Sequence, residues 1–124
     1  MSVTPSISPS RPHVIKPLEA PTLRGPSDGS QLLYNPSTGR KMTVYWQGVP
    51  EANEYLLEVQ AESSAGSMTH LVWQEFLSVT TRDTQHTFTF GGPVPGRWRV
   101  YPLDTTGAHF RSRPTAWWHF QFDK

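Results

Sequence analysis

The feature that most constrains the fold is a series of short runs in which apolar and polar side chains alternate. In one such run, Met42, Val44 and Trp46 alternate with Thr43 and Tyr45. Successive side chains of a β-strand point to opposite faces of its sheet, so this pattern is typical of a strand with one buried face. Clusters of Gly, Pro, Asn and Asp separate the runs, as expected for turns between strands.

Seven runs of this kind follow one another along the chain. The first opens at Leu23, and the others occupy residues 41–47, 54–62, 70–79, 84–90, 97–103 and 116–122. The connections between them are too short or too rich in Pro and Gly to supply the crossover helices of a parallel sheet. We therefore expect an all-β fold, an antiparallel two-sheet sandwich of about seven strands.

The run at residues 70–79 predicts a strand without fixing which of its faces is buried. Leu71 and Trp73 fit an inward face, and so do Val72 and Phe76 in the opposite register. Both registers remain open from the sequence, because each places large apolar side chains on the same side.

The first 19 residues differ from the rest in composition. They contain four Pro and four Ser and no periodic apolar pattern. Such a segment buries too little surface to offset the entropy of ordering it, which predicts a flexible tail or linker over residues 1–19 and one folded domain over residues 20–124. The alternative is an arm docked on the domain through Val14, Ile15 and Leu18.

Large rings are the main material for a core in this chain. Hydrophobic residues make up 35% of the 124 residues, but there are five Trp, four Tyr and six Phe, and no Cys. Without Cys, the chain has no disulfides, no thiol nucleophile and no cysteine ligands for zinc, so the fold depends on packing. The predicted core consists of Trp46, Tyr55, Leu57, Val59, Phe88, Phe90, Trp98, Val100, Trp118 and Phe120.

Charge and hydropathy exclude several classes of partner. The 11 basic and 10 acidic residues nearly cancel, whereas a general nucleic-acid binder carries a basic excess. No apolar run approaches the roughly 20 residues that span a bilayer, and the N-terminus lacks the apolar stretch of a secretory signal. We expect neither nucleic-acid binding nor a membrane span.

Residue patterns for catalysis are missing from the sequence. There is no Gly-x-Ser-x-Gly elbow, and Ser67 lies in a small polar loop. Glu54, Glu58 and Glu62 are spaced by four, which places all three on one side of a strand, where a solvated face is the simplest interpretation. We therefore expect a protein that is not an enzyme.

Candidate metal ligands are scattered along the chain. The isolated histidines are His70, His86, His109 and His119, and the acidic residues considered for calcium are Asp28, Asp83 and Asp104. Neither set has the close spacing of a zinc or calcium site. No metal and no cofactor is expected.

Three segments resemble fibronectin type III-like domains, an immunoglobulin-like sandwich family, of the bacterial and phage type. They are APTLRGPSDGSQL, TVYWQGVPEANEYLLEV and GRWRVYPLDTTG, followed by an aromatic last strand. The resemblance spans about residues 20–123 and rests on Trp46 under the core, Tyr55 in the third strand, and the Trp98-Arg99-Val100 segment of the sixth. Two departures stand out. Gly96 replaces a tyrosine, and Pro102 predicts that the sixth strand bulges or ends there.

The resemblance implies that the third, sixth and seventh strands share a sheet, with the sixth in the middle. Its outer face then carries Glu58, Glu62, Arg97, Arg99, Tyr101, Trp117 and His119. Adjacent Trp117 and Trp118 point to opposite faces, so only one of them can be buried, and we expect Trp117 to face outward. The alternative is that Trp117 lies flat on the sheet, covered by arginine side chains or by the loop at residues 111–113.

An outward Trp near Tyr and Arg side chains is typical of binding hot spots. The candidate binding residues are Trp117, Tyr101, Arg99 and His119, with Trp73 as a further candidate. The family implies a non-catalytic interaction or spacer module in a larger surface, secreted or virion-associated assembly, with a protein or a neighbouring domain as its partner. The alternative is a carbohydrate-binding module that uses Trp117 and Tyr101.

Overall fold

The computed structural model describes residues 18–63, 72–106 and 113–123, and these residues form eight strands. The strands are β1 (Thr22–Gly25), β2 (Ser30–Leu32), β3 (Lys41–Gln47), β4 (Glu54–Ser63), β5 (Val72–Thr81), β6 (Gln85–Thr89), β7 (Pro95–Leu103) and β8 (Trp118–Phe122). The described part of the chain contains no helix, and hence none that could cross a membrane.

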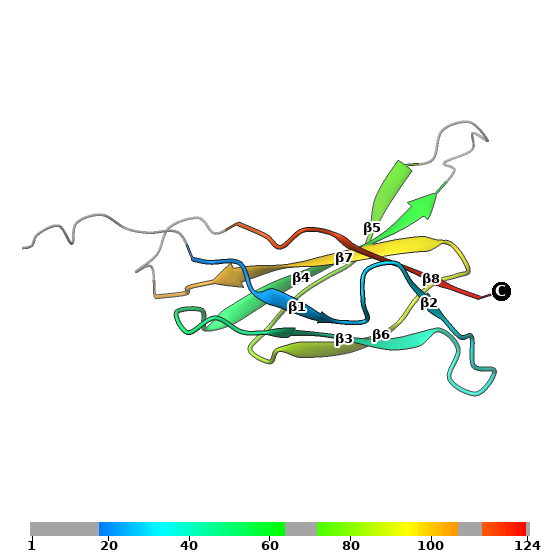
Figure 1. Cartoon of the computed structure of the whole chain (residues 1–124), viewed down its shortest axis with the longest axis horizontal. Coiled ribbons are helices and arrows are strands. Elements are labelled where there is room, and N and C mark those ends of the chain that lie inside the picture. The colour runs from blue at the N-terminus through cyan, green and yellow to red at the C-terminus, as the bar shows by residue number, and fades with distance from the viewer. Residues whose placement is uncertain (1–17, 64–71, 107–112, 124) are drawn as a thin grey trace, which may run out of the picture.

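Two sheets pack face to face (Figure 1). One has three strands in the order β1-β3-β6, and the other has five in the order β2-β8-β7-β4-β5. All neighbouring strands are antiparallel except β2 and β8. The predicted two-sheet sandwich is confirmed, and β7 lies between β4 and β8 as the resemblance implied.

Strand β2 is an addition to the seven predicted strands. Its three residues pair in parallel with β8, Ser30 opposite Phe120 and Leu32 opposite Phe122. The N–H of Gly29 donates to the carbonyl of His119 at 2.7 Å, and the N–H of Asp123 donates to that of Leu32 at 2.9 Å. This parallel pair is an addition to the predicted antiparallel sandwich, and its two strands lie far apart in sequence and need no crossover helix.

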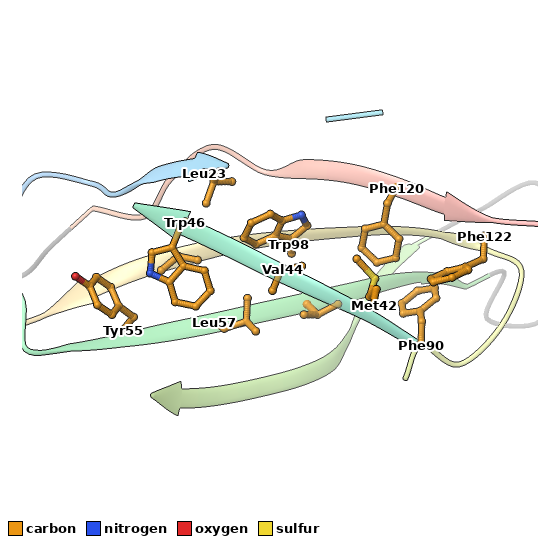
Figure 2. Close-up of a cluster of buried hydrophobic side chains, with 12 residues drawn as sticks. Leu23, Met42, Val44, Trp46, Tyr55, Leu57, Phe90, Trp98, Phe120 and Phe122 are labelled. Carbon is orange, nitrogen blue, oxygen red and sulfur yellow. The ribbon is translucent and has the colours of Figure 1, made fainter. Parts of the chain in front are cut away.

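The core lies between the sheets and is built from rings of both (Figure 2). Phe90, Phe120 and Phe122 gather at one end of it, and Trp46 and Tyr55 lie at the other. The centroids of Phe90 and Phe120 are 4.9 Å apart in an edge-to-face arrangement, which suits the ring quadrupoles. Of the ten residues predicted for the core, Phe88 and Trp118 are partly buried and pack against it, and the other eight are buried.

A β-bulge in β5 determines which side chains of this strand point to the core, a question that the sequence leaves open. Val59 of β4 pairs with Leu77, but the next residue, Gln60, pairs with Glu75, so Phe76 has no partner opposite it. One extra residue in a strand reverses the sheet face to which the side chains of all preceding residues of that strand point. Leu77 therefore points to the core side, whereas Trp73 lies on the outer face of the sheet.

Strand β7 continues through Pro102, although the sequence analysis predicted a bulge or an end there. Tyr55 pairs with Pro102 and Glu54 with Leu103, without a shift in register. The N–H of Val100 donates to Thr115 Oγ1, away from β4, and the nitrogen of Pro102 points the same way because it is two residues further along. The described pairing between β7 and β8 ends at Trp98. The missing amide hydrogen of Pro102 therefore costs no hydrogen bond of this ladder.

The chain before β1 includes a buried residue that the sequence analysis placed in the tail. Leu18 is 4% exposed, and Leu23 of β1 is 6% exposed. Val14 and Ile15, the other two residues of the docked-arm alternative, lie outside the described residues. The packed part of the chain thus extends at least to Leu18.

Candidate functional site

Strand β7 supplies the middle of the candidate site through simple alternation. Trp98 and Val100 are fully buried against the core, so Arg97, Arg99 and Tyr101 point to the outer face of the five-stranded sheet. These three outward side chains are only partly exposed. Their neighbours on β4, β5 and the approach to β8 therefore define the site.

Arg97 lies between two indole rings. Its Cζ is 4.3 Å from the ring centroid of Trp73 and 4.2 Å from that of Trp117. Its Nε donates a hydrogen bond of 2.8 Å to Oε1 of Gln60, the residue opposite it on β4. The guanidinium is therefore held by two cation–π contacts and one hydrogen bond to a neutral amide.

Arg99 repeats the arrangement two residues further along β7. Its Cζ is 4.2 Å from the ring centroid of Trp117 and 5.0 Å from that of Tyr101. Its Nε donates to Oε1 of Glu58 at 2.8 Å, and the two side chains are 24% and 26% exposed. Because water still reaches both groups, this ion pair stabilises the sheet by only about 1 kcal/mol or less.

Together these contacts form an alternating row, which we name the arginine–aromatic ladder. Its members in order are Trp73, Arg97, Trp117, Arg99 and Tyr101. Trp117 is its centre, because it is the ring that both guanidinium groups share. Trp117 thus lies on the outer face and also beneath arginine side chains, which combines the two arrangements considered from the sequence.

Trp118 faces the opposite way from Trp117. It pairs directly with Trp98 across the β7–β8 ladder, and the two ring centroids are 6.1 Å apart. Directly opposed residues of an antiparallel pair lie on the same face of the sheet, and Trp98 is in the core. Trp118 therefore belongs to the edge of the core.

His119 connects the ladder to the loop before β2. Its ring centroid is 5.8 Å from that of Trp73, edge to face, and its Nδ1 lies 3.3 Å from Oδ1 of Asp28. The backbone N–H of His119 donates to the same carboxylate oxygen at 2.6 Å. This backbone hydrogen bond is the main cause that holds the pKa of Asp28 below its ordinary value.

The charges at the centre of the ladder are not balanced. Desolvation is the first cause that lowers the pKa of Arg97 from its ordinary value, and the like charge of Arg99 is the second. Glu58 pairs with Arg99, whereas Arg97 has only the neutral Gln60. Arg97 therefore has no carboxylate as a hydrogen-bond partner among the described residues, although Glu62 and Glu75 lie on the same face of the sheet.

The chemistry available elsewhere in the described chain is limited. Its residues include no group of three or more His, Asp or Glu side chains placed to hold a metal ion. A shallow depression lined by Arg82, Asp83, Thr84 and Gln85 lies at the turn between β5 and β6 and contains no ladder residue. The ladder is thus the feature that best suits a functional role.

The sequence analysis did not predict that two further residues, Gln60 and Asp28, belong to the site. Gln60 faces outward because it lies two residues from Glu58 on β4, a relation that strand alternation could have revealed. Asp28 reaches the site from a turn 91 residues away from His119 in sequence, and no local pattern indicates that contact.

The strand arrangement identifies the class of sandwich. Sheet β1-β3-β6 faces a sheet in which β5, β4, β7 and β8 are neighbours, with Trp46, Tyr55 and Trp98 at the positions that carried the resemblance. The fold is fibronectin type III-like. The sequence itself matches no family model and no curated protein.

Two solved structures are similar to the chain at low identity. A Fn3-like protein from Clostridium thermocellum shares 18% identity with a TM-score of 0.49, over 86% of this chain and 97% of that one. The FN1–FN3 domains of chicken CNTN1 share 14% identity with a TM-score of 0.45, over 86% of this chain and 35% of that one. These similarities concern the fold alone, so the function has to be inferred from the outer face.

Proposed function

We propose that this fibronectin type III-like domain is a non-catalytic interaction module in a larger surface, secreted or virion-associated assembly, and that it binds a protein or a neighbouring domain through the ladder face. The observation that carries the proposal is the arginine–aromatic ladder on the open side of the five-stranded sheet. A module that acts as a spacer alone needs no such face.

The composition of the ladder supports a binding role. Trp, Tyr and Arg are the residue types most enriched among side chains that dominate binding energy at protein interfaces. In this ladder the arginines are already fixed by stacking and by hydrogen bonds to Gln60 and Glu58. A partner would therefore lose less free energy to side-chain ordering than on a surface of mobile side chains.

A carbohydrate ligand is the second candidate. Trp73, Trp117 and Tyr101 lie along one sheet face, as in a platform for sugar rings. However, each of these rings already has a guanidinium within 5.0 Å of its centroid. The stacking contacts that a sugar would need are thus partly taken, and this favours a protein partner.

Site-specific photocrosslinking tests the proposal. A photoreactive phenylalanine analogue replaces Tyr101 on the ladder face or, as the matched control, Tyr45, which is 48% exposed on β3 of the other sheet. In cells that make the protein, we expect a discrete crosslinked protein product from position 101 and none from position 45. Equal products from both positions, or none from position 101, would contradict the proposal.

A glycan titration followed by tryptophan fluorescence separates the second candidate. Because Trp73 and Trp117 lie on the ladder face, a sugar bound there would change their emission. We expect no change across neutral glycans. A saturable shift that Trp117→Ala abolishes would favour the carbohydrate-binding module instead.

A further inference from the structure

The edge strands of the two sheets differ in how they are protected from pairing with a further strand. Natural proteins protect edge strands by brevity, by charged side chains, by Pro or by bulges. Strand β1 has a register shift at Arg24 and is followed by Pro26, β2 has only three residues, and β5 has its bulge at Phe76 beside Glu75. Strand β6 has none of these features, because its five residues, Gln85–Thr89, pair with β3 in unbroken register and include no Pro, Lys, Arg, Asp or Glu.

The backbone groups of β6 point alternately toward β3 and toward the open side of the sheet. Directly before the strand, the N–H of Trp46 donates to the carbonyl of Thr84 at 3.0 Å. Directly after it, the N–H of Phe90 donates to the carbonyl of Arg40 at 2.8 Å. Since the direction alternates along an antiparallel strand, the residues whose N–H and C=O groups point away from β3 are Gln85, Thr87 and Thr89. No strand of the described chain lies on that side of β6.

The side chains on the inner side of this edge are apolar and incompletely covered. Leu77 and Val79 of β5 point to the core side but are only partly buried, and so is Phe88 of β6. Phe76 is 37% exposed, and its ring centroid lies 6.2 Å from that of Phe88. By contrast, Val59, the partner of Leu77 on β4, is 0% exposed. The three-stranded sheet therefore covers the core less completely beside β5 than at its centre.

We infer that the free edge of β6 binds an extended segment of a partner protein as an added antiparallel strand, with apolar side chains at alternate positions over Phe76 and Phe88. An extended backbone matches the two-residue spacing of the three open positions on β6. Apolar side chains on its inner side would cover the partly exposed rings, and a charge at those positions would be desolvated without an ion-pair partner on β6. The segment is therefore uncharged and alternates apolar with polar residues.

A single segment fits this edge better than a second copy of the chain. Strand β5 lies beside β6, as the contact between Phe76 and Phe88 shows, so two sandwiches joined at β6 would also bring their β5 strands together. The edge belongs to the three-stranded sheet, whereas the arginine–aromatic ladder lies on the five-stranded one. The inference thus goes beyond the proposed function and does not depend on it.

Synthetic peptides test this inference on the unmodified chain. The probe is a peptide of alternating Thr and Val with one Lys at each end for solubility, and a control peptide has Ser in place of Val. Binding is followed by NMR through the backbone amide signals of Gln85, Thr87 and Thr89. We expect saturable shifts of these signals with the Val peptide, and binding weaker by about tenfold or more with the Ser peptide because the apolar contacts are lost.

Methylation of the peptide backbone tests the strand pairing itself. Residues opposite each other in an antiparallel pair have side chains on the same face, so Thr residues of the probe lie opposite the three open positions and point their amides toward β6. N-methylation of the Thr amides should weaken binding by about tenfold or more, since the hydrogen bonds to β6 are lost. N-methylation of the Val amides, which point away from β6, should leave binding unchanged.

Protein variants locate the interaction at the middle of β6. Thr87→Pro removes an N–H that points away from β3, so it blocks the edge without breaking a backbone hydrogen bond to β3, and it should weaken binding by about tenfold or more. The matched control Thr87→Val keeps this N–H and loses the hydroxyl that lies 2.6 Å from Oγ1 of Thr43, and it should bind as the unmodified chain does. If Thr87→Pro does not fold, the methylated peptides still decide the question with the unmodified chain.

Several results would overturn the inference. They are the absence of saturable shifts with the Val peptide, equal binding of the Val and Ser peptides, equal binding of the two methylated peptides, or equal losses in Thr87→Pro and Thr87→Val. Dimerisation in sedimentation experiments that Thr87→Pro abolishes would also overturn it and identify a second copy as the occupant. The crosslink at position 101 reports on the other sheet, and β6 separates position 45 on β3 from the added strand, so failure of either proposal is recognised separately.

Discussion

On the inner face of β7, Trp98 and Val100 are fully buried against β3 and β4, whereas on its outer face Arg97 and Arg99 lie partly exposed over Trp117. Each face carries large rings, but the rings have different neighbours. Indoles inside touch other apolar groups, such as Trp46 at 6.4 Å from Trp98 between centroids. Indoles outside touch guanidinium groups, which keep hydrogen-bond donors in contact with water.

The inner face of β7 thus contributes mainly to the stability of the domain, and its outer face contributes to the candidate binding site. Burial of an indole in the dry core contributes several kcal/mol, whereas an exposed cation–π contact contributes about 0.5–1 kcal/mol. Loss of an inner ring should therefore unfold the domain much more readily than loss of an outer one. Substitutions on the outer face should therefore lower the stability of the domain only slightly.

The largest effect is expected for Trp98→Ala. Trp98 is 0% exposed and packs against Trp46 and Trp118, so its removal leaves a cavity in the centre of the core. We expect the free energy of unfolding to fall by about 3–5 kcal/mol, measured by urea denaturation. A loss below about 1 kcal/mol would show that the core is not packed around this ring.

Gly96→Ala should have the next largest effect. A Cβ at this position would lie 2.3 Å from Cζ of Phe120 and 2.8 Å from Cζ of Phe90, two rings that are each 3% exposed and cannot move aside easily. We expect a loss of about 2 kcal/mol in the same assay. In Gly92→Ala the new methyl group meets nothing within 4 Å, so this control should be close to neutral. Equal losses in the two variants would contradict the packing of Phe120 over Gly96.

Trp117→Ala tests the difference between inner and outer rings most directly. It removes the ring shared by Arg97 and Arg99 and should lower the free energy of unfolding by about 1–2 kcal/mol, the sum of two exposed cation–π contacts. Trp118→Ala, which removes a ring packed against the core, should cost more. The reverse order would mean that Trp117 is the inner residue.

Glu58→Gln tests how far the outer face contributes to stability. The variant retains a hydrogen-bond acceptor for Arg99 but removes the charge of a pair that is about a quarter exposed. We expect a loss of about 0.5 kcal/mol that decreases as salt is added. Insensitivity to salt would show that the ion pair acts only through its hydrogen bond.

The smallest effect concerns Asp28, whose pKa is lower in the folded protein than in the unfolded chain. Its contribution to stability is fully present above its ordinary pKa and is lost as the pH falls through the lower, folded value. Melting temperatures below pH 4 should therefore fall slightly more steeply for the unmodified chain than for Asp28→Asn. Parallel curves would contradict a role for the hydrogen bond from His119.

Alternation accounts for what the sequence could predict. The run at residues 41–47 coincides with β3, because every second side chain there is buried. The same rule places Arg97, Arg99 and Tyr101 on the outer face. Strand β2 was missed because three residues are too few to show a period.

The remaining features depend on contacts that no local pattern records. The bulge at Phe76 turns Trp73 outward, and a single extra residue in an apolar run leaves no trace in composition. The contact between Trp73 and Arg97 joins strands that are separated in the sheet by β4. The outward-facing residues of β7 in the ladder could thus be predicted from the sequence, but the order in which the rings and guanidinium groups stack could not.

The geometry at Trp117 is the central claim, and the Nε–H signals of Arg97 and Arg99 in a ¹⁵N-resolved NMR spectrum test it most directly. Protons above an indole face are shifted upfield by its ring current, whereas the hydrogen bonds to Gln60 and Glu58 shift the same protons downfield, so the test is the change in each signal when a ring is removed. In Trp117→Ala, both should move downfield together, whereas Trp73→Ala should move only that of Arg97. Two signals that Trp117→Ala leaves unaffected would contradict the ladder.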